Sequence, residues 1–487
     1  MHFSIPDTKE YTENGSSYIG YNIHINGVYH CTVRYKQLHN LHEQLKRKCG
    51  SSNLPQFPPK KFLPLTTSQL YDRRAQLEKY VQAIGQESRI ITSNILNSFL
   101  RNAQQESEGS VTEQTTMDIY LMNGYQIQIH LLTTDQTNTV LKKVCEQINL
   151  PPEYIDYFAL FCIRRNENGD ITIVRKLEDF ESPYISQKLY ENSKHSDVQR
   201  IYLRKMCWDP EYDLELMCHP VSLNLLYVQT VSDVERGWII CTKSVLAQLA
   251  DLQSRGAKKQ YLELARTLKY YGYMQFGYAI SDYPQPDTRV IIAIGKRELS
   301  MRLPSATECN TREGCFKVTR MRCWRITTVR KNDTNDCDPE PQLELSFEYL
   351  LSKDKLRWIN ISSPHAIFMS TCLQSVVDEL LLKKNGLSGG VGDSSGATKQ
   401  FNNIDAKNHS WTYMKRDGSI SLIDLNSSVD APENVENTPR SSQQWSEPFS
   451  IKKLQEKFSN SALSRFMSGN NQFIENDAFE DIGDEDL

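Results

Sequence analysis

The sequence predicts a multidomain α+β protein, in which strand-rich and helix-rich segments follow one another and a polar tail comes last. The chain has 487 residues, too many for one ordinary core, so three or four domains are expected. Hydrophobic residues make up 39% of it and charged residues 24%, which is typical of packed domains in water. Apolar residues alternate in some segments and recur every three or four positions in others, and breaks rich in Pro, Gly and polar residues separate the segments.

Charge, targeting signals and cysteines exclude several classes of protein. The formal net charge is −4, from 56 basic and 60 acidic residues, so the whole chain gives no reason to expect a nucleic-acid partner. Its first residues lack the basic start and apolar run of a signal peptide, and no segment approaches the roughly 20 apolar residues of a membrane span. The 12 cysteines form no Cys-x-x-Cys pair. We therefore expect a cytoplasmic monomer with free thiols, no metal and no cofactor.

The first predicted domain combines a hairpin, a proline-rich loop and helices. Apolar residues alternate from Ser17 to Val33 around Asn26-Gly27, a pair that favours a tight hairpin turn. The three prolines between Leu54 and Lys61 exclude regular structure and predict a stiff loop. A helical pattern covers residues 69–101, and the polar run 102–114 predicts a linker.

The middle of the chain predicts a small roll, a helical bundle, and a sheet closed by one helix. The roll opens with a hairpin around Asn123-Gly124, and a helix and three strands follow it. From Trp208 to Tyr271 the period is helical. Strands dominate from Met274 to Ile361, and a helix is expected from Ser363-Pro364 to Lys384, because Ser is a good cap and Pro suits the first turn. The remainder is low in apolar residues and predicts disorder, with a weak amphipathic patch at 451–466.

Basic residues in the first domain are the candidates for binding an anionic headgroup. Arg34 and Lys36 flank Tyr35 where a predicted strand ends, Lys60 follows the prolines, and Arg73 comes early in a helix. Together they offer the paired N–H donors of a guanidinium for a phosphate, further cations, and an aromatic ring on which an inositol ring can stack. For any one of these residues alone, an ordinary solvated charge is the simpler interpretation.

The order Arg-Tyr, Pro-Pro-Lys, Arg-Arg-x-x-Leu-x-x-Tyr resembles the PX family of phosphoinositide-binding domains. The resemblance implies that Arg34 holds the 3-phosphate, that Tyr35 stacks on the ring, and that Lys60 and Arg73 contact the remaining groups. Phe62, Leu63 and Leu65 would enter the bilayer beyond the proline loop, where their burial would add affinity in proportion to area.

The later sheet and its closing helix predict a groove for a peptide. Met369, Cys372, Leu373, Val376 and Leu380 form a stripe that should pack on the sheet, and Val377 and Leu381 lie one turn apart on its flank. If the strand that contains Trp324 lies beside this helix, an extended peptide could add to it as a further strand. Without other information, Trp324, Val377 and Leu381 would more often be core residues than residues of a binding groove.

After the PX-like domain, the order of roll, bundle and closed sheet resembles a FERM module whose last lobe is shaped like a phosphotyrosine-binding domain. The chain is similar to the PX-FERM sorting nexins from its start to Lys384, notably at 224–227, 231–238, 318–325 and 482–487. The implied domains are 1–108 PX, 115–206 F1, 207–272 F2, 273–385 F3, and a tail at 386–487. The implied ligands of Trp324, Val377 and Leu381 are Asn-Pro-x-Tyr and Asn-x-x-Tyr signals in receptor tails, as in the low-density-lipoprotein-receptor family, integrin β and P-selectin. Arg320, Arg322 and Arg325 leave phosphotyrosine selection open, although we expect unphosphorylated peptide to be preferred.

The C-terminal end is acidic and predicts a partner with a basic, partly apolar pocket. Residues 471–487 contain seven carboxylate side chains and neither Lys nor Arg. The simpler interpretation is that such a tail only keeps the protein in solution. By resemblance the partner is the Retriever complex, with the associated CCC and WASH assemblies, on early and recycling endosomes. The residues that would bind it are Ile482, Gly483, Asp484, Glu485, Asp486 and Leu487.

Within this tail, Asn476-Asp477-Ala478-Phe479 is itself an Asn-x-x-aromatic signal. A long tether brings such a segment back at high effective concentration, so Asn476 and Phe479 are candidates for occupying the chain's own Trp324 groove. Chance is the rival explanation, since a four-residue pattern recurs easily.

The sequence offers little to support an enzyme. It contains no His-Glu-x-x-His, no Gly-x-Ser-x-Gly and no phosphate loop ending in Lys-Ser or Lys-Thr. A cytoskeletal linker is the better rival to an adaptor, but the acidic tail lacks a basic actin-binding segment. The resemblance to the PX-FERM sorting nexins implies an endosomal cargo adaptor that carries receptors back to the cell surface and away from lysosomes.

Overall fold

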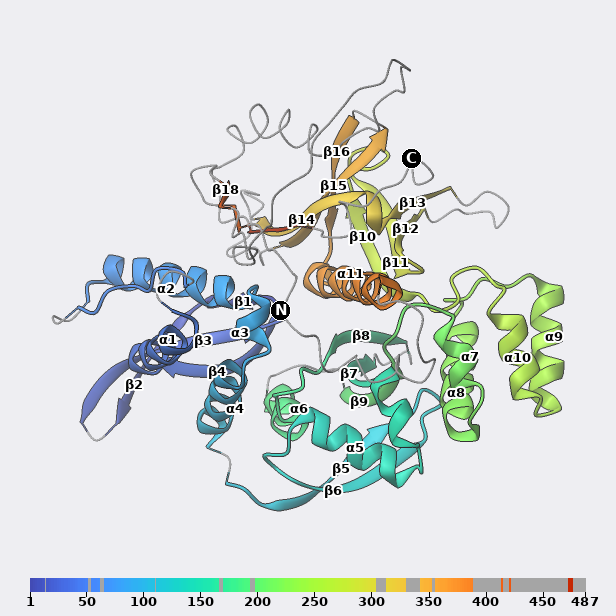
Figure 1. The fold of residues 1–487 in the computed structure, drawn as a ribbon, viewed down its shortest axis with the longest axis horizontal. Helices are drawn as coiled ribbons and strands as arrows, with labels where there is room; N and C mark the ends of the chain where they lie inside the picture. Colours follow the sequence, from blue (N-terminus) through green and yellow to red (C-terminus); the bar gives the residue numbers. More distant parts are fainter. Residues whose placement is uncertain are drawn as a thin grey trace, which may run out of the picture.

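The chain folds into four successive units, each with its own mixture of helices and strands (Figure 1). The computed structural model describes residues 1–13, 15–50, 54–61, 65–109, 111–165, 170–192, 198–303, 312–329, 342–352 and 355–388, together with 413–414, 420–421 and 472–475. No helix in these ranges is long and apolar enough to cross a bilayer. The patch predicted at 451–466 lies outside them.

The first unit places a small antiparallel sheet against helices. Its strands are β1 Phe3–Ser4, β2 Thr8–Glu13, β3 Ser16–Ile25 and β4 Val28–Arg34, and its helices are α1 Tyr35–Cys49, α2 Thr67–Ile84, α3 Ser88–Ile91 and α4 Asn94–Glu108. The predicted hairpin is confirmed, with positive φ angles of 50° at Asn26 and 82° at Gly27. The helical pattern at 69–101 is interrupted at Gly85, which ends α2, and at Ser93, which caps α4.

The linker predicted at 102–114 is wrong, because α4 continues to Glu108 and a strand starts at Gln114. Gln104 is polar but buried, since its amide accepts from the Ser182 backbone N–H at 2.8 Å and donates to the Ser186 hydroxyl at 3.1 Å. A buried amide with both its groups bonded is tolerated. Sequence composition alone cannot distinguish such an interface from a solvated linker.

The second unit is the predicted roll. Its elements are β5 Gln114–Tyr120, β6 Gln126–Leu132, α5 Thr137–Gln147, η2 Pro152–Tyr157, β7 Phe158–Arg165, β8 Ile171–Lys176, α6 Pro183–Asn192 and β9 Val198–Lys205. The strand order is β6-β5-β9-β7-β8, with β5 and β9 parallel. Helix α6 was not predicted; it packs against β9 and α4.

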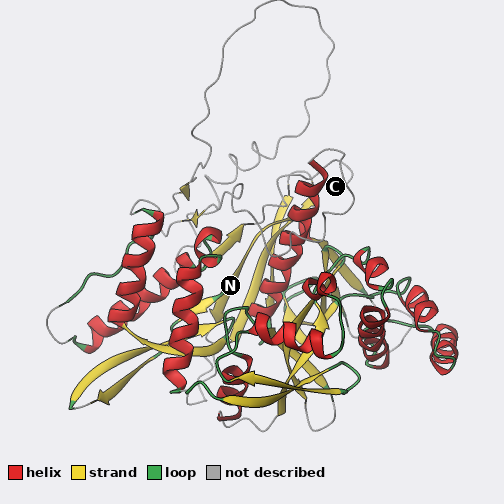
Figure 2. Cartoon of the chain, turned by 60° about the horizontal axis from the view of Figure 1, so that its bottom comes forward, coloured by secondary structure: helices red, strands yellow, loops and turns green. Residues whose placement is uncertain are grey.

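The third unit is helical, as the period predicted (Figure 2). It contains α7 Tyr212–Leu216, α8 Pro220–Glu235, α9 Lys243–Ser254 and α10 Lys258–Ala265. A buried ion pair ties it to the second unit, because Lys205 Nζ lies 2.6 Å from Asp213 Oδ1 and the Tyr271 hydroxyl donates to Asp213 Oδ2 at 2.8 Å. With its hydrogen bonds satisfied, this carboxylate is tolerated in the interior.

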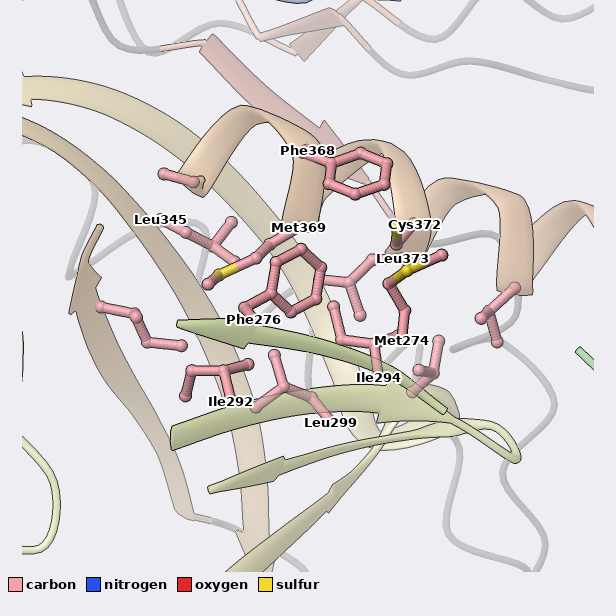
Figure 3. Close-up of a cluster of buried hydrophobic side chains, with 14 of the residues drawn as sticks. Met274, Phe276, Ile292, Ile294, Leu299, Leu345, Phe368, Met369, Cys372 and Leu373 are labelled. Carbon is pink, nitrogen blue, oxygen red and sulfur yellow. The ribbon is translucent and has the colours of Figure 1, made fainter. Parts of the chain in front are cut away.

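The fourth unit is a bent antiparallel sheet closed by one long helix. Its elements are β10 Met274–Ser281, β11 Thr288–Gly295, β12 Glu298–Arg302, β13 Glu313–Lys317, η3 Val318–Arg320, β14 Met321–Val329, β15 Gln342–Ser352, β16 Lys355–Ser362 and α11 Ala366–Ser388. The predicted stripe of α11 is confirmed: Met369, Cys372 and Leu373 point into the core between helix and sheet (Figure 3). Strands dominate from Met274 to Ile361, as predicted, and the turn η3 separates β13 from β14.

Apolar packing fixes the first unit on the second. Phe180 of the second unit belongs to the core of the first, where its ring meets His30 edge-on with 5.7 Å between centroids. Asn26 Nδ2 donates to Glu178 Oε1 at 2.7 Å. Burial of His30 lowers its pKa to about 4, so the ring is neutral at physiological pH and adds no charge to this interface.

Glu379 on α11 joins the fourth unit to the segment that links the second and third. Its carboxylate accepts the backbone N–H groups of Trp208 at 2.9 Å and Asp209 at 2.7 Å, while the Trp208 indole donates to the Ser375 hydroxyl at 2.9 Å. Burial raises the pKa of Glu379, although the two amide donors act in the opposite direction. Glu379, supported by Ser375, therefore helps to set the orientation of α11.

We expect Glu379→Ala to lower the free energy of unfolding by about 2–4 kcal/mol, because two buried amides lose their acceptor. Denaturant unfolding of the full chain measures this change. Glu263→Ala, at an exposed position of α10, is the matched control and should change stability by less than about 0.5 kcal/mol. Equal stability of the two variants would contradict the role of Glu379.

Candidate functional site

The side chain of Arg34 is held where β4 ends and α1 begins. Its backbone N–H donates to Gln37 Oε1 at 2.7 Å, and its guanidinium lies 3.4 Å from the centre of the Tyr18 ring. Tyr18 comes from the neighbouring strand β3 and stacks in turn on Tyr11. This stack fixes the direction of a cation that is exposed to solvent.

Tyr35 lies between the proline loop and α2. Its hydroxyl donates to the Pro58 carbonyl at 2.8 Å, and the guanidinium of Arg73 lies 4.5 Å from its ring centre. Phe57 anchors the loop by packing on Tyr35 and on His42. Burial lowers the pKa of His42, so it is neutral at physiological pH and bonds the Tyr80 hydroxyl at 3.0 Å.

Arg73 and Arg74 are adjacent in sequence but differ in their surroundings. Arg74 bonds the Ile5 carbonyl and pairs with Glu78 at 3.4 Å, which is a structural role. Within the part of the chain that the structure describes, Arg73 Nη2 is buried and has no hydrogen-bond partner. An unbonded guanidinium nitrogen above an aromatic ring is a group that a phosphate or hydroxyl could satisfy.

The remaining candidates of this site differ in exposure. Lys36 and Lys60 are exposed, and Leu65 is half-buried just before α2. Phe62 and Leu63 lie outside the described residues. The structure therefore brings Arg34, Tyr35 and Arg73 to one end of the first unit, and this donor set fits an anionic ring-shaped headgroup.

The second candidate site, predicted as a groove, is the region where β14 packs against α11. Trp324 is fully buried on β14, and its indole N–H donates to the Ser370 hydroxyl of α11 at 3.0 Å. Val377 is also buried, whereas Leu381 is partly buried at the margin of the same core. Trp324 and Val377 are thus core residues, and Leu381 is the one of the three predicted contacts that is partly exposed.

A segment of the tail pairs with this edge. Strand β19, Gln472–Glu475, is antiparallel to β14, with Cα partners Cys323↔Glu475, Trp324↔Ile474, Arg325↔Phe473 and Ile326↔Gln472. It is the outermost strand of the sheet ordered β13-β12-β11-β10-β16-β15-β14-β19. Residues 476–487, which include Asn476, Phe479 and the acidic terminus, lie outside the described residues.

Sequence reasoning missed three contributors to these sites. Tyr18 lies in an alternating strand, and Ser370 in an apolar helix, so neither position carries a signal of its own. The pairing segment Gln472–Glu475 was detectable, because it directly precedes the Asn-x-x-aromatic pattern, and peptides of this kind commonly add as strands.

Four family descriptions match the chain in succession. These are the PX domain at residues 21–103, the F1 lobe of the sorting nexin 17/27/31 FERM domain at 115–208, the F2 lobe of the sorting nexin 17/31 FERM domain at 209–269, and the sorting nexin 17 FERM C-terminal domain at 272–381.

Curated relatives extend this match over most or all of the chain. Sorting nexin-17 of Danio rerio is 44% identical over 504 residues, with 100% of both chains covered. Sorting nexin-17 of Homo sapiens is 48% identical and covers 79% of this chain and 83% of its own. Human sorting nexin-31 is 34% identical, with coverages of 79% and 86%.

Among solved structures, a designed CISK-PX domain is 30% identical, with a TM-score of 0.19, and covers 20% of this chain and 97% of its own. The FERM and C-terminal domain complex of Drosophila Merlin is 12% identical, with a TM-score of 0.39, and covers 57% of this chain and 99% of its own.

The matched domains and relatives define a non-enzymatic endosomal sorting adaptor, in which a PX domain that binds phosphoinositide precedes a FERM module that binds cargo tails. The chain belongs to the sorting nexin-17 family. Its PX domain implies peripheral association with endosomal membranes.

We expect Tyr18→Leu to weaken binding of a soluble inositol phosphate about 2- to 5-fold, because Arg34 loses the ring that orients it. Isothermal titration calorimetry of the full chain measures this affinity. Tyr125→Leu, an exposed position in the F1 lobe, is the control and should leave the affinity unchanged. An unchanged affinity in Tyr18→Leu would exclude the orienting role.

Proposed function

We propose that this protein binds phosphatidylinositol 3-phosphate on early endosomes and Asn-Pro-x-Tyr or Asn-x-x-Tyr signals in receptor tails, and links them to Retriever for recycling to the cell surface. The observation that carries the peptide half is the edge strand β19. An extended segment already adds to β14 beside Trp324, immediately before an Asn-x-x-aromatic sequence. The backbone of β14 is therefore able to accept a peptide strand.

The lipid half rests on the donors around Tyr35. The proposed roles are that Arg34 holds the 3-phosphate, that Tyr35 stacks on the ring, and that Arg73, Lys36 and Lys60 contact the remaining oxygens. The unbonded Nη2 of Arg73 supports this assignment, because it is a buried donor beside the aromatic floor. Phe62, Leu63 and Leu65 are the proposed bilayer contacts.

The three arginines that could select phosphotyrosine already have contacts within the fourth unit, which supports a preference for unphosphorylated peptide. Arg320 donates to the Leu351 carbonyl at 2.9 Å, Arg322 pairs with Glu348, and Arg325 stacks on Trp358. None of these contacts requires a phosphate as its partner.

Two parts of the proposal concern the tail. Ile482 to Leu487 are proposed to bind Retriever, on the strength of the acidic sequence and of the resemblance at 482–487. Asn476 and Phe479 are proposed to hold the tail on the chain's own groove until a receptor tail displaces them. Pairing of the adjacent β19 with β14 supports this competition.

For the lipid site, we expect Arg73→Gln to weaken binding to vesicles containing 3% phosphatidylinositol 3-phosphate by about 10- to 100-fold, since a charged donor to phosphate is lost. Vesicle co-sedimentation measures the partition. Arg289→Gln removes an arginine of the fourth unit that stacks on Tyr278, and it is the matched control. Equal binding by both variants would refute the lipid site.

For the tail, we expect a chain ending at Gly469 to bind a labelled Asn-Pro-x-Tyr peptide about 10-fold more tightly, if the groove is open in about a tenth of full-length molecules. Fluorescence anisotropy measures both affinities. Leu381→Glu should abolish binding in both chains, because it puts a charge at the margin of the apolar core beside β14. Unchanged affinity after truncation would remove the competition from the proposal.

A further inference from the structure

In a strand that adds to the edge of β14, the side chains alternate between the two faces of the sheet. Trp324 pairs with Phe347, which pairs with Ile359, and all three are fully buried in the core beneath α11. Neighbouring residues of a strand point to opposite faces, and directly paired residues share a face. Cys323 and Arg325 therefore lie on the face away from α11.

The face away from α11 carries a defined group of side chains. The guanidinium of Arg325 lies 4.7 Å from the centre of the Trp358 ring, reaching across β15 to β16. Beside them, Cys323 pairs with Glu348, which pairs with Trp358. Arg325 and Trp358 are half-buried, whereas Ser346, the residue paired with Arg325 on β15, is fully buried beneath them.

The register of β19 assigns peptide positions to these residues. The strand ends at Glu475, one residue before the asparagine of the Asn-x-x-aromatic sequence. Counting back from that asparagine, position −1 pairs with Cys323, position −2 with Trp324 and position −3 with Arg325. A receptor tail bound in the same register would place its −2 residue on the helix side and its −3 residue next to Arg325.

We propose that Arg325 and Trp358 form a second recognition surface, which selects an aromatic residue three positions before the asparagine of the sorting signal. This inference rests on the proposed peptide-binding function and names a specificity of the same site. A planar guanidinium can stack with aromatic rings on both of its faces, so an arginine on an indole is suited to recognise a further ring. The tail of this chain has Phe473 at that position.

The burial of Arg325 makes such a stack more effective than one at an open surface. Burial lowers the pKa of this arginine, with Glu344, Cys323 and Glu348 acting against the shift, which indicates a partly desolvated cation. Attraction between a cation and a ring increases when water is excluded. A lysine at position −3 would instead meet Arg325 as a like charge and would be disfavoured.

The test compares peptides that differ only at position −3. Labelled Asn-Pro-x-Tyr peptides with Phe, Leu, Ala or Lys at −3 are titrated with the full chain, and fluorescence anisotropy gives each Kd. We expect the Phe peptide to bind about 3- to 10-fold more tightly than the Ala peptide, and the Lys peptide to bind least. The chain's own tail competes with every peptide to the same extent, so it changes each apparent Kd by the same factor. The ratio of two Kd values measured on one variant is therefore unaffected by the tail.

Arg325→Gln is expected to bring the Phe-to-Ala ratio close to 1, and Trp358→Leu, a second and independent variant, is expected to do the same. Arg289→Gln is the matched control, because Arg289 stacks on Tyr278 at 3.7 Å on β11, several strands away from β14. A second control varies position −2, whose preference should persist in Arg325→Gln because that position pairs with Trp324.

The outcomes separate this inference from the function on which it rests. If the wild-type chain binds all peptides with equal affinity, the second recognition surface is refuted while peptide binding stands. A preference that survives in both Arg325→Gln and Trp358→Leu refutes it as well. If no peptide binds the wild-type chain or the chain ending at Gly469, the proposed function itself fails, and the inference falls with it.

Discussion

The contact of Glu379 with the backbone of Trp208 and Asp209 is the constraint on which the geometry of the FERM module depends. One carboxylate on α11 satisfies two amides of the segment between the F1 and F2 lobes, and Ser375 one turn earlier accepts from the Trp208 indole. The adjacent face of the same helix closes the core of the F3 sheet. The position of α11 is thus fixed by two neighbouring faces, and Val377 and Leu381 on it are fixed relative to β14.

In the proposed function, a rigid helix beside an edge strand allows the sheet to accept a peptide without rearrangement. The donors and acceptors of the outer edge of β14 are already aligned, because β14 is held by eight residue pairs with β15. The Trp324 indole is held by the Ser370 hydroxyl, so the core beside this edge is packed before any peptide binds. Preorganisation of this kind lowers the entropic cost of binding an extended segment. It also leaves the groove accessible to the chain's own tail.

The lipid site and the groove lie in different units, yet the units are packed together. Phe180 of the F1 lobe completes the core of the PX domain. The side-chain amide of Gln104 in the PX domain forms hydrogen bonds with Ser182 and Ser186 of the F1 lobe. Orientation of the PX domain on a membrane would consequently orient the FERM module also. The polar run that looked like a linker is in fact the place where the two halves are joined.

The sequence by itself determined the hairpin at Asn26-Gly27 and the apolar stripe of α11, since local turn chemistry and periodicity are encoded in neighbouring positions. Its resemblance to PX domains singled out Arg34, Tyr35 and Arg73 as candidates for the lipid site. Only the tertiary structure decided that Arg34 stacks on Tyr18, that Glu379 is buried, and that Gln472–Glu475 pairs with β14. These contacts join residues far apart along the chain, and their formation depends on how complete surfaces fit, which no local pattern encodes.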